Sequence, residues 1–77
     1  MRMVVAYIMV KAHTADADRL RDNTKALGGV TAAHIVAGDV DIIAKADVDA
    51  PADVKDIAKS IRDLDGVENT QTYIAMG

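Results

Sequence analysis

Cysteine is absent from this 77-residue chain, and so are phenylalanine and tryptophan. Without cysteine the chain can form neither a disulfide nor a thiolate metal site. Its core must come from Val, Ile, Ala, Leu and Met, because the only aromatic residues are two tyrosines. A chain of this length buries only about 60% of its unfolded surface, which makes a monomer marginally stable. We therefore expect chains to associate and bury additional surface.

Basic residues are also few: 9 Lys and Arg face 12 Asp and Glu, giving a formal net charge of −3. Direct nucleic-acid binding is not expected, because it needs a stripe of Lys and Arg against the phosphates. The longest apolar run, residues 3–10, is too short to span a membrane and lacks a signal-peptide cleavage site. We expect one cytoplasmic domain spanning residues 1–77, with no membrane contact.

Hydrophobic periodicity and turn residues predict six elements. They are a strand at 3–10, a helix at 15–27, strands at 30–37 and 40–47, a helix at 51–64 and a strand at 67–76. Thr14 is the expected cap of the first helix, and Asp49 or Ala50 that of the second. A tight turn at 38–39 is expected to join the middle strands. The order βαββαβ predicts an α+β, ferredoxin-like sandwich.

In this topology the first strand is central, yet it is apolar on both sides. The two sets are Met3, Val5, Tyr7 and Met9 on one side, and Val4, Ala6, Ile8 and Val10 on the other. Both helices lie on one face of the sheet, so one set has no cover from its own chain. Exposed apolar faces of this size mark interfaces. We expect a dimer, with sheet packed against sheet across a two-fold axis.

The turn formed by Gly38, Asp39, Val40 and Asp41 is the first candidate ligand site. Glycine in a turn exposes backbone N–H groups to a carboxylate, and a nearby Asp can receive an ammonium group. Every free amino acid presents these two groups. Asp41 has apolar neighbours, so its carboxylate needs a partner. A plain hairpin turn is the competing interpretation of the same residues.

The last strand offers two further candidates, Thr70 and Thr72, which point to the same side and could supply hydroxyl groups. Strand propensity alone also accounts for them. No metal or other cofactor is expected, because His13 and His34 are isolated from one another. Ser60 has no base beside it, and no acid/base pair is evident, so catalysis is not expected.

Two stretches, residues 34–46 and 61–74, resemble a known family. The first resembles the V-x-G-x-x-D signature of the Lrp/AsnC effector domain, also called the RAM domain. The second is similar to that family's closing pattern I-x-x-L-x-G-V-x-x-T-x-T-x-I. Regulators of this family carry a helix-turn-helix domain ahead of the effector domain, whereas this sequence begins with the first effector-domain strand. The resemblance is thus to a stand-alone RAM protein.

This resemblance implies a domain that senses an amino acid or small metabolite beside the 38–41 turn, at an interface between dimers. It also implies dimers that assemble into rings, and co-assembly with full-length Lrp/AsnC regulators, through which transcription is modulated indirectly. Two alternatives stay open: a purely structural oligomerisation module, and an ACT-type amino-acid-binding regulatory domain. A small enzyme on the same scaffold would need a cluster of His and carboxylates that the sequence lacks.

Overall fold

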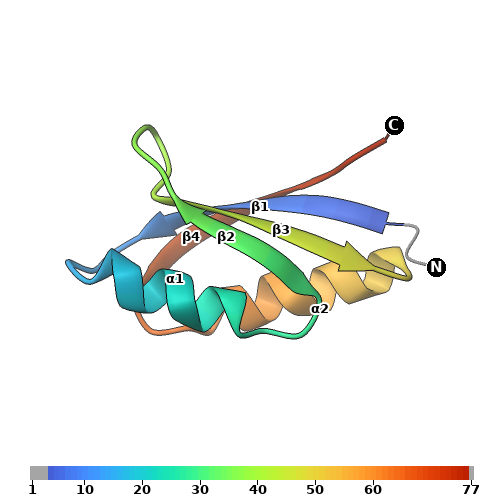
Figure 1. The fold of residues 1–77 in the computed structure, drawn as a ribbon, viewed down its shortest axis with the longest axis horizontal. Helices are drawn as coiled ribbons and strands as arrows, with labels where there is room; N and C mark the ends of the chain where they lie inside the picture. The colour runs from blue at the N-terminus through green and yellow to red at the C-terminus, as the bar shows by residue number, and fades with distance from the viewer. Residues whose placement is uncertain (1–3, 77) are drawn as a thin grey trace.

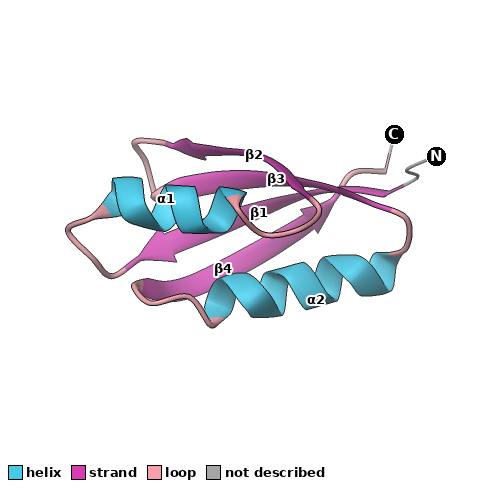
Figure 2. Cartoon of the chain, turned by 60° about the horizontal axis from the view of Figure 1, so that its bottom comes forward, coloured by secondary structure: helices cyan, strands magenta, loops and turns pink. Residues whose placement is uncertain are grey.

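The computed structural model describes residues 4–76, which form six elements. They are β1 (Val4–Ala12), α1 (Ala17–Lys25), β2 (Val30–Ile35), β3 (Ile42–Val48), α2 (Pro51–Arg62) and β4 (Val67–Ile74). The strands form one antiparallel sheet in the order β2-β3-β1-β4, and both helices cover the same face (Figure 1 and Figure 2). The expected ferredoxin-like fold with a central first strand is confirmed. Met3, expected in that strand, lies outside the described residues.

The connection between β2 and β3 is longer than the sequence predicts. The predicted tight turn at 38–39 was wrong, since the chain between the strands runs over Val36–Asp41 and stands out beyond the sheet (Figure 1). Backbone hydrogen bonds explain the difference. Asp41 donates its N–H to the carbonyl of Val10 on β1, and its own carbonyl accepts the N–H of Val36, both at 2.9 Å. The second bond continues the β2–β3 register one pair beyond Ile35 and Ile42, and residues 37–40 are left as a projecting loop.

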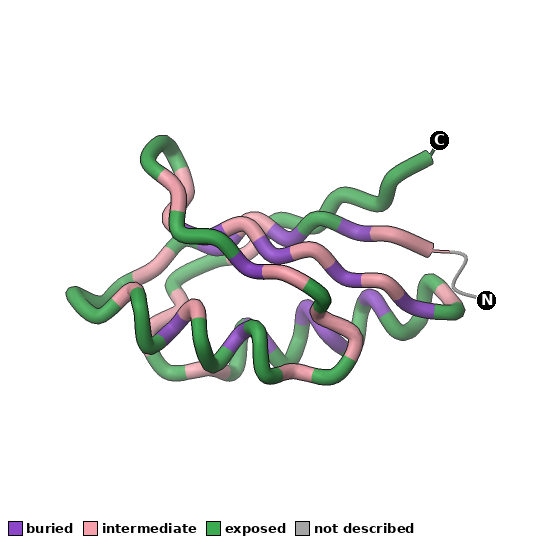
Figure 3. Tube along the Cα trace, viewed as in Figure 1, coloured by how far each residue is buried: buried purple, intermediate pink, exposed green. Residues whose placement is uncertain are grey.

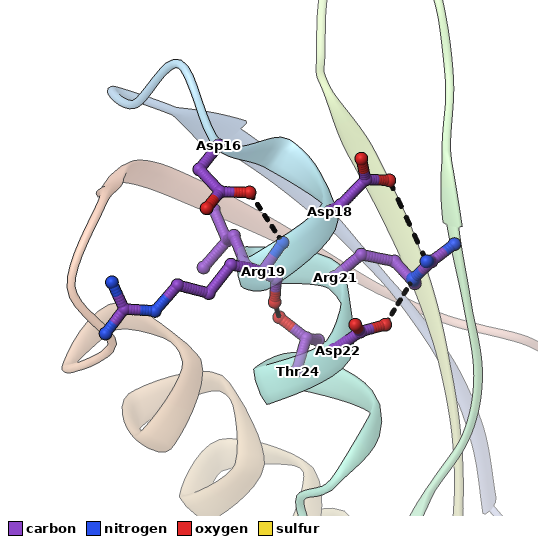
Figure 4. Close-up of polar contacts among 7 residues, drawn as sticks. Asp16, Asp18, Arg19, Arg21, Asp22 and Thr24 are labelled. Carbon is purple, nitrogen blue, oxygen red and sulfur yellow. Dashed lines mark hydrogen bonds and ion pairs between the residues drawn. The ribbon is translucent and has the colours of Figure 1, made fainter.

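The first helix begins at Ala17, and its cap is Asp16 rather than the predicted Thr14. The Asp16 carboxylate accepts the N–H of Arg19 at 3.0 Å (Figure 4). The Thr14 hydroxyl accepts the N–H of Asp16 at 3.1 Å. Asp16 caps the helix in place of Thr14 because its negative carboxylate also interacts favourably with the positive end of the helix dipole. Farther along α1, the buried Thr24 hydroxyl donates to the carbonyl of residue 20 at 2.8 Å.

The second helix follows its prediction closely, with Ala50 as N-cap and Pro51 in the first turn. The Asp53 carboxylate accepts the Ala50 N–H at 3.3 Å, which is the half of a capping box that needs no polar side chain at the N-cap. The predicted apolar stripe faces the sheet. Its buried members are Val54, Ile57, Ala58 and Ile61, and Leu64 packs beside them.

The core lies between the helices and one face of the sheet (Figure 3). The sheet contributes Ala6, Ile8 and Val10 from β1 and Ile42, Ala44 and Ala46 from β3, and all six are fully buried. Alternation along each strand puts every second residue on this face. Leu20 and Ile61 cover them from the two helices.

The other face of the sheet has no cover from any described element. Val5 and Met9 are only partly buried there, and Tyr7 is 39% exposed although it lies on a central strand. The register places Tyr7 between Lys45 of β3 and Tyr73 of β4. The expectation that one apolar face of the first strand is left open by its own chain is confirmed.

Gly29 is a position where the fold requires glycine. Its φ is +91°, and an added Cβ would lie 2.7 Å from Ile57 Cδ1 and 3.1 Å from Val48 Cγ1. We expect Gly29→Ala to lower the free energy of unfolding by about 2 kcal/mol, from left-handed strain plus overpacking. Gly28→Ala is the matched control, because nothing lies within 4 Å of its added Cβ. Urea unfolding of both variants tests this, and equal losses would contradict it.

Candidate functional site

A cavity of about 360 Å³ lies on the open face, where the end of β1 and the start of β4 meet the β2–β3 loop. Its lining residues are Met9, Lys11, Asp39, Val40, Glu68, Asn69, Thr70 and Gln71. The register explains their meeting, because Met9 pairs with Gln71 and Lys11 with Asn69. Three segments distant in the sequence therefore build one hollow.

Lys11 joins the sheet to the loop. Its Nζ donates to the backbone carbonyl of Asp39 at 3.2 Å, and this bond positions the loop beside the cavity. An ammonium group carries three donors, so two remain for a ligand. Glu68 lies across the cavity on β4, and its Oε1 is 3.9 Å from Nδ1 of the exposed His13. The hollow therefore presents both a cation and carboxylates.

The structure divides the six residues that the sequence singled out. Asp39, Val40 and Thr70 border the cavity. Gly38 is next to them in the loop, fully exposed to open space, with nothing within 4 Å of an added Cβ. The Thr70 side chain is directed to the helix-covered face, because its register partner is the buried Val10.

Asp41 has a structural partner within the chain. Its Oδ2 accepts the backbone N–H of Ala12 at 2.8 Å, in a part-buried setting. The pairing of β1 with β3 ends at Val10 and Ile42, so this N–H lies beyond the ladder and would otherwise lack a partner. The carboxylate thereby holds the irregular end of β1 against the loop. This is the partner that its apolar neighbours made necessary.

Thr72 lies away from the cavity. Like Thr70 it is directed to the helix side, as expected from their shared parity, since it pairs with the buried Ile8. It lines a separate groove of about 330 Å³ between α2 and β4. The two threonines therefore lie on the same face of β4, but Thr70 borders the cavity and Thr72 lines the groove.

Lys11, Glu68 and Met9 line the cavity although the sequence analysis did not select them. Alternation along β1 does place Met9 and Lys11 on the same face as Tyr7, and that signal could have found them. Their proximity to Asp39 and Glu68 depends on strand order and register, which no local pattern reports. Pairing between strands that are distant in the sequence therefore brings the polar residues of this site together.

Other site types find no support in residues 4–76. No group of three or more His, Asp or Glu side chains is placed to hold a metal ion within this range. No helix among these described residues has the length and apolar character needed to cross a membrane.

These observations define a class: a ferredoxin-like α+β domain with a ligand-sized cavity at the edge of an open sheet face. Comparison with protein families gives a more specific result, since the model of the Lrp/AsnC ligand binding domain matches residues 5–77. The chain belongs to the Lrp/AsnC ligand-binding domain family.

Solved structures agree in fold. TTHA0845 of Thermus thermophilus aligns with a TM-score of 0.91 at 24% identity, covering 97% of this chain and 95% of that one. The hypothetical protein PHS023 of Pyrococcus horikoshii aligns with a TM-score of 0.85 at 28% identity, and the match covers 96% of this chain and 90% of that one. The regulatory protein Rv3291c of M. tuberculosis, solved with L-methionine, aligns at 0.80 and 18% identity; the match covers 99% of this chain but 52% of that one. No curated protein sequence matches the chain.

Removing the Asp41 carboxylate tests its structural role. We expect Asp41→Ala to lower the free energy of unfolding by about 1–2 kcal/mol, because the part-buried Ala12 N–H loses its acceptor. Asp39→Ala is the control, since Asp39 is exposed and contacts Lys11 through its backbone carbonyl rather than its side chain. Chemical denaturation measures both. A loss in the control as large as that in Asp41→Ala would contradict the assignment.

Proposed function

We propose that this chain is a cytoplasmic amino-acid-sensing regulatory domain that works as a homo-oligomer. The observation that carries the proposal is the cavity on the open sheet face, which presents opposite charges beside the β2–β3 loop. A free amino acid is a zwitterion, and recognising it needs a donor for the carboxylate and an acceptor for the ammonium group. This hollow provides both.

In the proposed complex, Lys11 and the exposed backbone around Gly38 bind the ligand carboxylate. Glu68 and the Asp39 side chain are the acceptors available to its ammonium group. Met9 offers an apolar contact to the ligand side chain. Val40 and Thr70 complete the border, while Asp41 acts indirectly by fixing the loop.

The family supports this choice of ligand class. Rv3291c, a structural neighbour, has been solved in complex with L-methionine. The TM-score of 0.80 shows a shared fold, and at 18% identity it shows the fold alone, so the transfer of ligand class is part of the proposal. The ACT-type interpretation names the same class of ligand, but the family match favours the Lrp/AsnC assignment.

The open face supports self-association. Val5, Tyr7 and Met9 of β1 lie there beside Ile43 of β3 and Tyr73 of β4. Tyr73 is 56% exposed, and an amphipathic aromatic of this kind is typical of interface centres. We propose that two copies pack face to face, and that dimers then assemble into rings. The cavity borders this face and would lie between subunits.

Regulation of transcription by this chain would be indirect, through mixed assemblies with full-length members of the family. Catalysis forms no part of the proposal. A second candidate, a purely structural oligomerisation module, is favoured by the same open face and requires no ligand. The two differ in whether an amino acid binds, and each has a test.

Self-association is tested on the open face. We expect light scattering to give the wild type a mass at least twice the 8.2 kDa of one chain. Tyr7→Glu should shift this toward the monomer, because a charge must then be desolvated between the sheets. Ser60→Glu, exposed on α2, is the control. If Tyr7→Glu unfolds, the wild-type Tm still tests the assembly, because the Tm of an obligate oligomer rises with protein concentration. A monomeric wild type whose Tm is independent of concentration would refute the assembly.

Sensing is tested by calorimetric titration with each of the twenty amino acids. We expect at least one to bind, and Glu68→Gln to weaken it about tenfold through loss of a charge-assisted hydrogen bond. Lys25→Gln, at the end of α1, is the matched control. An oligomer that releases heat with none of the twenty would sink the sensing proposal and favour the structural module.

A further inference from the structure

The groove between α2 and β4 is chemically unlike the cavity on the open face. Its lining residues are Pro51, Val54, Lys55, Ala58, Arg62, Thr72 and Ile74. They include two cations and no carboxylate, whereas the cavity contains carboxylates as well as a cation. The groove also lies on the helix side of the molecule, so face-to-face packing of two sheets would leave it open.

The two cations of the groove are free to meet a ligand. None of the ion pairs recorded within residues 4–76 involves Lys55 or Arg62. The neighbouring Lys59, by contrast, is paired with Asp63 at 3.3 Å. The two residues are seven positions apart along α2, which is about 10 Å along the helix axis. Two long side chains at this spacing can both reach one anionic group between them.

The apolar side chains of the groove gather toward one end, while the two cations lie on either side of its middle. α2 and β4 run in opposite directions along it, so Pro51 and Val54 lie toward the Ile74 end, and Arg62 lies toward the start of β4. Ile74 is 43% exposed, and Val54 is buried beneath it. Thr72, between the two ends, presents a hydroxyl with no hydrogen bond recorded among the described residues. An anionic group beside Thr72 and Ala58 would lie between the two cations, and a short aliphatic tail from it would reach Ile74.

We propose that the α2–β4 groove is a second ligand site, which takes a small aliphatic carboxylate without an ammonium group, such as a branched-chain 2-oxo acid. The carboxylate lies between Lys55 and Arg62, with Thr72 donating to it, and the tail contacts Val54 and Ile74. An amino acid is disfavoured because its ammonium group would meet two cations and no acceptor carboxylate. The site is independent of amino-acid binding on the open face.

The test is a titration of the folded chain with 4-methyl-2-oxopentanoate and, separately, with leucine, followed by backbone and methyl NMR. We expect the oxo acid to shift the resonances of Ala58, Thr72 and Ile74, and leucine to leave them in place. Signals of the loop around Gly38 report the other cavity in the same spectra. Failure of one site is therefore visible separately from failure of the other.

Substitutions in α2 sharpen the test. Lys55→Gln and Arg62→Gln should each weaken oxo-acid binding about fivefold, the effect of losing one solvent-screened ion pair. Lys59→Gln is the matched control on the same helix and should leave the affinity unchanged. All three residues are exposed, so folding should be retained.

Several outcomes would overturn this inference. One is the absence of groove shifts at millimolar oxo acid, and another is an equal response to leucine. Unchanged affinity in the doubly substituted Lys55→Gln, Arg62→Gln chain would do the same. Groove shifts that appear on dilution of the ligand-free protein would assign the groove to a second copy of the chain instead.

Discussion

The central strand β1 is the constraint on which the rest of the structure depends. Its alternate residues Ala6, Ile8 and Val10 are fully buried under the helices, while Tyr7 and Met9 are left on the other side. Two helices in so short a chain can cover only one face of a four-stranded sheet. The uncovered face therefore sets both the proposed assembly and the position of the polar cavity at its edge.

Two hollows with different charges lie on opposite faces of the sheet. On the open face, Lys11 and Glu68 bring both signs of charge together, which suits a zwitterion. On the helix face, Lys55 and Arg62 line the groove and no carboxylate lines it with them, which suits an anionic ligand. β4 borders both, and the period of two along a strand assigns its residues to one face or the other. One edge strand can thus serve two sites with different ligands.

Local rules predicted the elements well but failed at particular ends. The stripe from Val54 to Ile61 was predictable because helical periodicity alone determines which residues face the core. The extent of the loop at 36–41 was not predictable, because Asp41 donates its N–H to the distant Val10 and its carboxylate accepts the N–H of Ala12. The α1 cap was misplaced for a local reason, since Thr14 and Asp16 are both good caps and only geometry separates them.

By itself, the sequence determined the order βαββαβ and the apolar character of both faces of β1. It also carried the Lrp/AsnC resemblance that the family match bears out. Only the tertiary structure decided that Asp39 joins Lys11 and Glu68 in one cavity, that Asp41 is bound to the backbone, and that Thr72 lies in another groove. The physical reason is strand register: it brings together residues far apart in the chain, and no periodicity within a single segment encodes it.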